Sequence, residues 1–252
     1  MTSPANALHD PQVAPSAQKA VALVTGASSG IGLATARRFA AAGYRVAVNH
    51  VDQEAVAEAV AAEIGGRAYW TDVSDPVAVA TMVDDIEGEL GPIAVAVCNA
   101  GIYEERSLAE LEDEIWERTI RVHLGGCFHV AREVVPRMRS RGSGSIVTVS
   151  SEMAIVGGTK ATHYIAAKTA IVGFTRALAR EVAPTIRVNA LAPGPVDTPL
   201  LQERFKVPAY TDTLPLRRIG RPEEIADVIL VLAETAWCTG AVWSLNGGVV
   251  IQ

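Results

Sequence analysis

The sequence predicts an α/β fold in which a parallel β-sheet is covered by helices on both faces. Two observations support this prediction. From residue 20 onward, short apolar runs alternate with longer amphipathic stretches, and this alternation is typical of βαβ units. The apolar runs are also nearly continuous, as at residues 93–97, which is expected of parallel strands that are buried on both faces.

In the first half of the chain, glycine and aspartate mark the ends of the helices. Gly43 and Gly65 each follow an amphipathic stretch, and glycine readily adopts the left-handed conformation that ends a helix. Asp75 precedes a third stretch and can cap its first turn. The predicted strands are residues 20–24, 45–48, 68–70 and 93–97, and the predicted helices are residues 31–42, 53–64 and 76–90.

In the second half, prolines limit the helices. Pro136 lies near the end of a long amphipathic stretch, and Pro184 follows the stretch that contains Tyr164. Pro222 begins the last stretch, at a first-turn position that suits proline. The predicted helices are residues 113–139, a helix that stops before residue 184, and 222–233, and the predicted strands are residues 145–149, 186–191 and 241–245. Right-handed crossovers arrange the seven strands as a doubly wound, Rossmann-like sandwich with helices on both faces.

The length and composition favour a single folded domain that begins after a short tail. The chain has 252 residues, of which 49% are hydrophobic and 20% charged, and this is enough apolar material for a substantial core. Residues 1–18 are rich in Ala, Pro and Ser and lack the basic and apolar regions of a signal peptide. We therefore expect a mobile tail at residues 1–18 and a single domain at residues 19–252.

Charge and cysteine usage exclude several classes of partner. The net charge is −6 and the basic residues are scattered, which disfavours nucleic acid as the main partner. No apolar run is long enough to span a membrane. Cys98, Cys127 and Cys238 are widely spaced and match neither a metal-ligand pattern nor a disulfide set. We therefore expect no metal site and a reducing, cytoplasmic location.

A glycine-rich segment at residues 25–32, Thr-Gly-Ala-Ser-Ser-Gly-Ile-Gly, joins the first strand to the first helix. Glycines let the backbone approach a pyrophosphate, and the helix N-terminus supplies free N–H groups and the positive end of a dipole. The spacing differs from the commonest dinucleotide fingerprint, and taken alone the segment could be a tight turn. Its position between a strand and a helix favours a nucleotide-binding site.

Tyr164 and Lys168 are four residues apart in one predicted helix, so their side chains lie on the same face. A nearby ammonium lowers the pKa of a phenol, and a phenol tuned in this way can act as a general acid or base. The alternative is a surface helix that carries a tyrosine and a solvated lysine.

The chain resembles the short-chain dehydrogenase/reductase family. The resemblance rests on these two motifs together with Asn99–Ala100–Gly101, Ser151 and Pro193–Gly194. The resemblance covers nearly everything after the tail, in the family's order. Residues 214–224 and 239–248 resemble the branch that contains 3-oxoacyl-carrier-protein reductases and small ketone reductases.

The resemblance implies an NAD(P)-dependent oxidoreductase that interconverts a ketone and a secondary alcohol by hydride transfer, with Ser-Tyr-Lys catalysis. It also implies a dinucleotide-binding catalytic domain with a lid at about residues 193–215, and a homotetramer that acts on a small molecule. One alternative is a 3-oxoacyl thioester reductase of the acyl-carrier-protein type. Another is a nucleotide-sensing protein without turnover.

The resemblance assigns roles to individual residues. Tyr164 is expected to be the acid/base, Lys168 to bind the nicotinamide ribose and lower the Tyr164 pKa, and Ser151 to bind the carbonyl oxygen, with Ser150 as the fallback. The expected cofactor-binding residues are Gly26, Ser28, Ser29, Gly30, Ile31, Gly32, His50, Asp72, Val73, Asn99, Ala100, Gly101, Tyr164, Lys168, Pro193, Gly194, Val196 and Thr198. The expected substrate pocket consists of Tyr103, Glu152, Met153, Val156, His163, Leu200, Leu201 and Phe205.

Three features of the sequence leave alternatives open. His123 stands where the family usually has an asparagine, and it is either satisfied by a backbone carbonyl or a member of a proton relay. By the same resemblance, His50 occupies the usual acidic position after the second strand, and Val51 the position that is often basic in NADP enzymes. The lack of positive charge favours NAD over NADP, and the alternative is that His50 forms a hydrogen bond to the phosphate of NADP. Glu152 either reads a polar group of the substrate or faces water.

Overall fold

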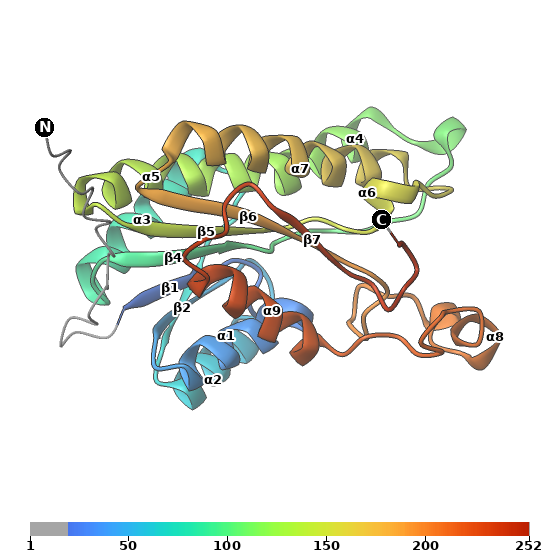
Figure 1. Ribbon diagram of the computed structural model, residues 1–252, viewed down its shortest axis with the longest axis horizontal. Coiled ribbons are helices and arrows are strands. Elements are labelled where there is room, and N and C mark those ends of the chain that lie inside the picture. Colours follow the sequence, from blue (N-terminus) through green and yellow to red (C-terminus); the bar gives the residue numbers. More distant parts are fainter. Residues whose placement is uncertain (1–19, 252) are drawn as a thin grey trace, which may run out of the picture.

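The computed structural model describes residues 20–251, and the expected tail at residues 1–18 lies outside them (Figure 1). The described chain contains a seven-stranded sheet of order β3-β2-β1-β4-β5-β6-β7, and every strand pairs in parallel with its neighbours. The strands are β1 (Val21–Val24), β2 (Arg45–His50), β3 (Arg67–Trp70), β4 (Ile93–Cys98), β5 (Gly144–Val149), β6 (Ile186–Pro193) and β7 (Val242–Leu245). This order confirms the doubly wound, Rossmann-like fold.

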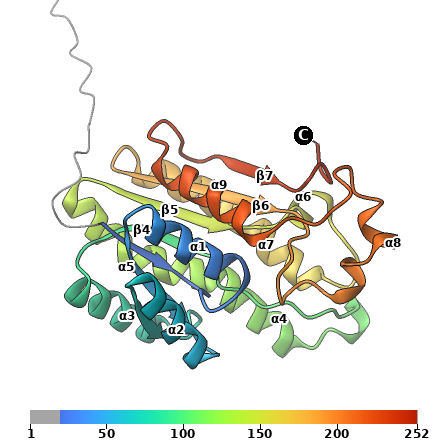
Figure 2. The ribbon, with the colours of Figure 1, turned by 90° about the horizontal axis from the view of Figure 1, so that it is seen from below.

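The main helices cover the two faces of this sheet (Figures 1 and 2). On one face lie α1 (Gly30–Ala41), α2 (Glu54–Ile64) and α9 (Pro222–Glu234). On the other face lie α3 (Pro76–Glu89), α4 (Asp113–Ile120), α5 (Gly126–Arg141) and α7 (Thr162–Val182).

Two apolar cores hold these layers together, one on each face of the sheet. Because successive residues of a strand point to opposite faces, β1 contributes Val21 and Leu23 to the core under α3, α5 and α7. The same strand contributes Ala22 and Val24 to the core under α1, α2 and α9. All four side chains are fully buried, which explains why the strand reads as a continuous apolar run.

The long predicted helix at residues 113–139 is interrupted. Between α4 and α5 the chain forms a π-helical turn, Arg121–Gly125, which contains His123. Wider turns of this kind inside helices often occur at functional sites. The apolar pattern of the sequence continues through this turn, so the interruption could not be seen from periodicity.

The segment predicted as a lid is partly helical. After β6 the chain forms the 3-10 turn η3 (Glu203–Phe205) and the short helix α8 (Pro208–Thr211), and another such turn, η1 (Leu108–Glu110), follows β4. A further short helix, α6 (Met153–Val156), follows β5. Helices of one turn carry no periodic signal, and none of these was predicted.

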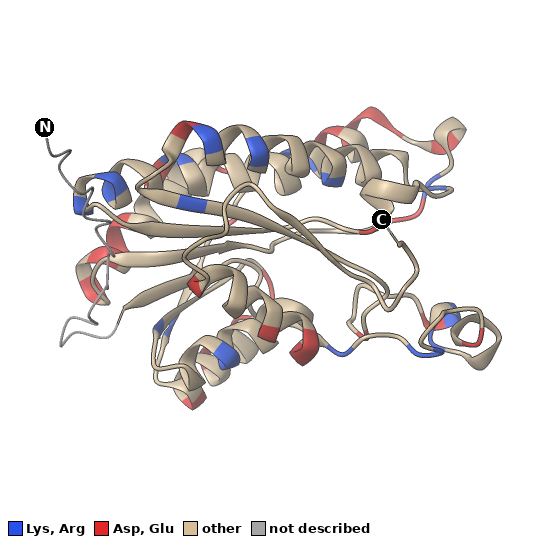
Figure 3. Cartoon of the chain, in the orientation of Figure 1, with Lys and Arg blue, Asp and Glu red and all other residues tan. Residues whose placement is uncertain are grey.

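Charged residues of both signs are mixed over the helices and loops, and the strands carry few of them (Figure 3). None of the helices among residues 20–251 has the length and apolar character that a bilayer crossing requires. In the same range, His, Cys, Asp and Glu side chains form no group of three that could hold a metal ion.

Candidate functional site

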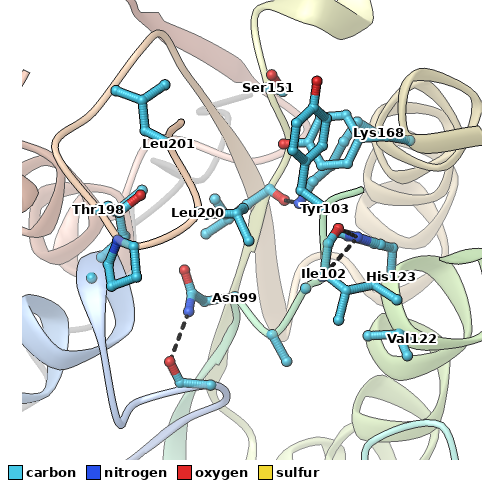
Figure 4. Close-up of a pocket in the computed structure, with 18 of the residues that line it drawn as sticks. Asn99, Ile102, Tyr103, Val122, His123, Ser151, Lys168, Thr198, Leu200 and Leu201 are labelled. Carbon is cyan, nitrogen blue, oxygen red and sulfur yellow. Dashed lines mark hydrogen bonds between the residues drawn. The ribbon is translucent and has the colours of Figure 1, made fainter. Parts of the chain in front are cut away.

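A cavity of about 810 Å³ opens at the carboxyl ends of the strands, where doubly wound folds bind their ligands. The loops after β1, β2, β3, β4, β5 and β6 all contribute to its wall. Figure 4 shows Tyr103, Ser151 and Lys168 together on one side of the cavity and Thr198 and Leu201 on the other, with Asn99 between them.

The glycine loop after β1 is held against the loop after β4 by Thr25 and Asn99. The Asn99 side-chain amide donates to the carbonyl oxygens of Thr25 at 3.0 Å and Gly26 at 3.3 Å. In return, the Thr25 hydroxyl oxygen accepts from the backbone N–H groups of Asn99 and Ala100 at 2.9 and 3.0 Å. These bonds fix the loop at the centre of the site.

The residues of this loop fit a dinucleotide. A Cβ at Gly32 would lie 2.1 Å from the Gly26 carbonyl oxygen, so the sharp turn needs glycine there. Ser29 precedes α1 without a side-chain bond to the first turn, and Ser28, Ser29, Gly30 and Ile31 line the cavity. The backbone N–H groups at this helix N-terminus are therefore available for a phosphate group.

Ser151, Tyr164 and Lys168 meet in the same cavity. The Lys168 Nζ donates to the Val149 carbonyl oxygen at 2.8 Å and lies 5.6 Å from the centre of the Tyr164 ring. All three side chains are buried. Of the two candidate serines, Ser150 donates its hydroxyl hydrogen to the Lys168 carbonyl oxygen at 2.7 Å, so its bond stabilises α7 against β5.

The pKa values differ from the expectation that Lys168 lowers the pKa of Tyr164. Burial raises the pKa of Tyr164, although the Ser151 hydroxyl lowers it partly. Burial also lowers the pKa of Lys168 to about 8. The expectation considered the lysine charge alone, whereas both groups are taken out of water and desolvation disfavours the charged form of each.

His123 is neutral and bound to the backbone. Its Nε2 lies 2.8 Å from the Ile102 carbonyl oxygen and 3.1 Å from the Ile102 backbone nitrogen, and its ring packs edge-on against Tyr164 with ring centres 5.4 Å apart. Burial, aided by the Lys168 charge, lowers the pKa of His123 to about 3. The contacts of Nε2 fit the backbone-satisfied alternative, whereas the buried Nδ1 has no hydrogen-bond partner among the described residues. The lowered pKa keeps the imidazole neutral near pH 7.

Two of the predicted cofactor-binding residues, Gly32 and His50, do not line the cavity. Gly32 is buried against the Gly26 backbone. His50 shares the face of β2 that carries Val46 and Val48 because strand side chains alternate, and it is buried with an unpartnered Nδ1. The side chains that follow β2 at the cavity are Val51, Asp52 and Gln53. The other cofactor residues predicted from the sequence all line the cavity.

His163 is the one predicted substrate-pocket residue that lies outside the cavity wall. It is 1% exposed, because consecutive residues of a helix point about 100° apart and Tyr164 takes the cavity side. Tyr103, Glu152, Met153, Val156, Leu200, Leu201 and Phe205 line the cavity as expected.

Several cavity residues were missed by the sequence reasoning. They include Asn49, Gln53, Thr71, Ser74, Glu105, Arg118, Arg121, Arg204 and Tyr210. Arg204 forms an ion pair with Glu105, which joins the segment after β6 to the loop after β4. The position of Tyr210 beside Phe205 could have been suspected, because both fall in the predicted lid.

Comparisons with known proteins agree with this arrangement. A family model described as enoyl-(acyl carrier protein) reductase matches residues 26–250. The chain is 40% identical to a 3-oxoacyl-[acyl-carrier-protein] reductase of Thermotoga maritima, covering 92% of this chain and 98% of that protein. It is 41% identical to a cis-4-hydroxycyclohexanecarboxylate dehydrogenase of Sinomonas cyclohexanicum, covering 90% and 95%. A crystal structure of a short-chain type dehydrogenase/reductase from Mycobacterium marinum superposes with a TM-score of 0.87 at 35% identity, covering 93% and 97%.

Proposed function

Because this chain belongs to the short-chain dehydrogenase/reductase family of NAD(P)-dependent oxidoreductases, we propose that it interconverts a ketone and a secondary alcohol with Ser151, Tyr164 and Lys168. The convergence of these three side chains in one cavity with the glycine loop carries the proposal. A protein that only senses a nucleotide has no need of this group.

Residues at the β1 end of the cavity would hold the dinucleotide. The N-terminus of α1 and the loop at Ser28 and Ser29 would bind its pyrophosphate, and Thr198 and Lys168, which line the same cavity, would bind its nicotinamide half. When bound, the nicotinamide supplies the hydride for reduction or accepts it in oxidation.

The chain's own residues handle the oxygen atom and the proton. Ser151 orients the carbonyl by donating a hydrogen bond to its oxygen, and Tyr164 gives that oxygen a proton as the alcohol forms. The ammonium of Lys168, 5.6 Å from the Tyr164 ring, favours the phenolate that remains. In the reverse direction, Tyr164 takes the proton back.

NAD is the proposed cofactor. Asp52 lines the cavity after β2, where a carboxylate suits the free hydroxyls of the adenosine ribose. The basic side chains that line the cavity, Arg118, Arg121, Lys168 and Arg204, all come from segments after β4. Thus none of the described basic residues comes from the loops after β1 and β2, where a 2′-phosphate needs a cation.

The proposal also includes a lid over the substrate, a homotetrameric assembly of the chain and a cytoplasmic location. Residues 193–215 cover the substrate, and the Arg204–Glu105 ion pair supports this arrangement. Exposed aromatic side chains support burial in a homotetramer, namely Trp116, Phe128, Trp237 and Trp243. The three free thiols are compatible with a cytoplasmic protein.

A 3-oxoacyl thioester reductase is the second candidate, because the Thermotoga relative carries that name at 40% identity. One experiment tests both functions. Oxidation of NADH and of NADPH is followed in parallel over aryl ketones, diketones and 3-oxoacyl esters, with Tyr164→Phe as control. Turnover that disappears in Tyr164→Phe supports the proposal and identifies the substrate class. Tight binding of the cofactor without turnover of any substrate would contradict it.

A further inference from the structure

Glu152 places a carboxylate beside the serine that is proposed to orient the carbonyl. The Ser151 hydroxyl donates to the Glu152 Oε2 at 3.1 Å, and its oxygen accepts from the Met153 backbone N–H at 3.2 Å. A serine hydroxyl has one hydrogen to donate. In this arrangement that hydrogen is already committed to Glu152.

No cation neutralises this carboxylate within residues 20–251. The other carboxylate on the substrate side of the cavity, Glu105, pairs with Arg204, but Glu152 takes part in none of the ion pairs of the described chain. Burial raises the pKa of Glu152 to about 7, and the bond from Ser151 lowers it only partly. A partly buried carboxylate without a counter-charge favours a cationic ligand.

Aromatic rings surround the same position. The Glu152 charge acts on Tyr103, Tyr164 and Tyr210, and it contributes to the raised pKa of each phenol. Tyr103 and Tyr164 stack edge to face with ring centres 5.0 Å apart, and Tyr210 stacks in the same way on Phe205 at 4.9 Å. Aromatic faces attract ammonium groups, most strongly where water is excluded.

Resting on the proposed reaction, we infer that Glu152 selects ketones and alcohols that carry an ammonium group close to the reacting carbon. The substrate cation pairs with the Glu152 carboxylate and draws it away from Ser151, so the serine hydrogen becomes free for the carbonyl oxygen. The short distance between Ser151 and Glu152 limits the spacing between the carbonyl group and the cation of the substrate. The carbonyl oxygen must lie at hydrogen-bond distance from Ser151, and the cation at ion-pair distance from Glu152. The cation is therefore separated from the carbonyl carbon by one or two bonded atoms.

A matched pair of probes isolates the effect of charge. Acetonyltrimethylammonium is a permanently charged ketone, and 4,4-dimethylpentan-2-one is its neutral isostere with carbon in place of nitrogen. The measured quantity is kcat/KM for the charged probe divided by kcat/KM for the neutral one. Because the charged ketone is intrinsically more reactive, the ratio is compared between the natural chain and Glu152→Gln, in which this intrinsic difference cancels.

We expect the ratio to fall by about tenfold or more in Glu152→Gln, which is typical of losing a charge contact in a water-poor site.

The rate of reduction of the neutral probe should also depend on pH. In the natural chain this rate should fall, relative to that of Glu152→Gln, as pH rises through about 7, because ionised Glu152 holds the Ser151 hydrogen more strongly. The groups that face Glu152, namely Ser151, Tyr103, Tyr164 and Tyr210, remain neutral there.

Glu114→Gln is the control, since this exposed carboxylate on α4 lies outside the cavity wall, and its ratio should stay within about twofold of the natural chain. Equal ratios in the natural chain and Glu152→Gln, or an equal fall in Glu114→Gln, overturn the inference while Tyr164-dependent turnover leaves the proposed reaction standing. Absence of turnover with every ketone overturns the proposed reaction, and the inference with it.

Discussion

His123 occupies the space that any side chain on Gly101 would need. A Cβ built on Gly101 would lie 2.5 Å from the His123 Cε1 and 3.0 Å from its Nδ1. The same imidazole bonds the backbone of Ile102 through Nε2. The loop after β4 and the π-helical turn before α5 are therefore fitted to each other around one ring.

Gly101→Ala should destabilise the protein and misplace the loop after β4. We expect the free energy of unfolding to fall by about 1–3 kcal/mol, as for other overpacked sites. Denaturant unfolding measures this loss, and adding His123→Asn, which shortens the opposing side chain, should recover part of it. Gly173→Ala is the control, because a Cβ there meets nothing within 4 Å. Simple additivity of the two changes would show that the residues do not compete for space.

His123 should make the protein less stable in acid. The unfolded chain protonates this histidine near pH 6.5, whereas the folded chain holds it neutral to about pH 3. Between these values the unfolded state binds the extra proton, so His123 lowers the stability by about 1.4 kcal/mol per pH unit as pH falls. The stability difference between the natural chain and His123→Asn, measured from pH 7 to 4, should change with this slope. A difference that does not vary with pH would show that His123 titrates normally.

The activity of His123→Asn should keep the shape of its pH profile. A neutral imidazole gives no ionisation near pH 6.5, so its replacement changes kcat without removing a limb of the profile. If the variant lost an ionisation between pH 5 and 8, His123 would have to be a member of the proton relay.

Ser151→Ala and Ser150→Ala should have different effects although the residues are neighbours. Loss of the Ser151 hydroxyl removes the proposed donor to the carbonyl oxygen and should lower kcat by about 10²-fold. Loss of the Ser150 hydroxyl removes its 2.7 Å bond to the Lys168 carbonyl oxygen, which costs about 1 kcal/mol of stability. Steady-state kinetics and thermal unfolding separate the two effects. Equal losses of kcat would mean that both serines touch the substrate.

NADH should be used more efficiently than NADPH, and Val51→Arg should reduce this preference. Val51 lines the cavity next to Asp52, where an added guanidinium could bind a 2′-phosphate. We expect kcat/KM for NADPH to rise by about tenfold. Val56→Arg, on the exposed face of α2, adds the same charge outside the cavity and should leave the preference unchanged. A natural preference for NADPH would contradict the assignment of Asp52.

The sequence predicted the structure best where local features, namely apolar runs and residue spacing, determine where a side chain lies. The strands were recognised because apolar residues on both faces of a parallel sheet leave continuous runs, and their bounds agree with the structure within two residues. Gly26, Tyr164 and Lys168 were found because their spacing relates directly to a loop or a helix face, and Ser151 was found through the family resemblance. All four line the cavity.

The sequence did not show the features of the site that depend on burial or on distant contacts. The orientation of His50 depends on strand alternation against α2, and the pKa of Tyr164 depends on how much water reaches it. Likewise, Cys98 and Cys127 lie far apart in the sequence, yet the two thiols are in contact, and their hydrogen bond raises the pKa of Cys98. None of these relationships follows from local spacing.

The two ends of the cavity are formed by two different parts of the sequence. The loops after β1, β2 and β3 precede residue 76 and line the end of the cavity where we propose that the dinucleotide binds. Ser151, Tyr164, Glu152 and the proposed lid come from segments after β4. The Thr25–Asn99 bonds join the two ends at the middle of the sheet. The gene is therefore suited to recombination between relatives at the turn before β4. If the proposed roles hold, we expect a crossover there to exchange coenzyme preference as one block and to leave substrate recognition in the other, provided that both parents keep this threonine and asparagine.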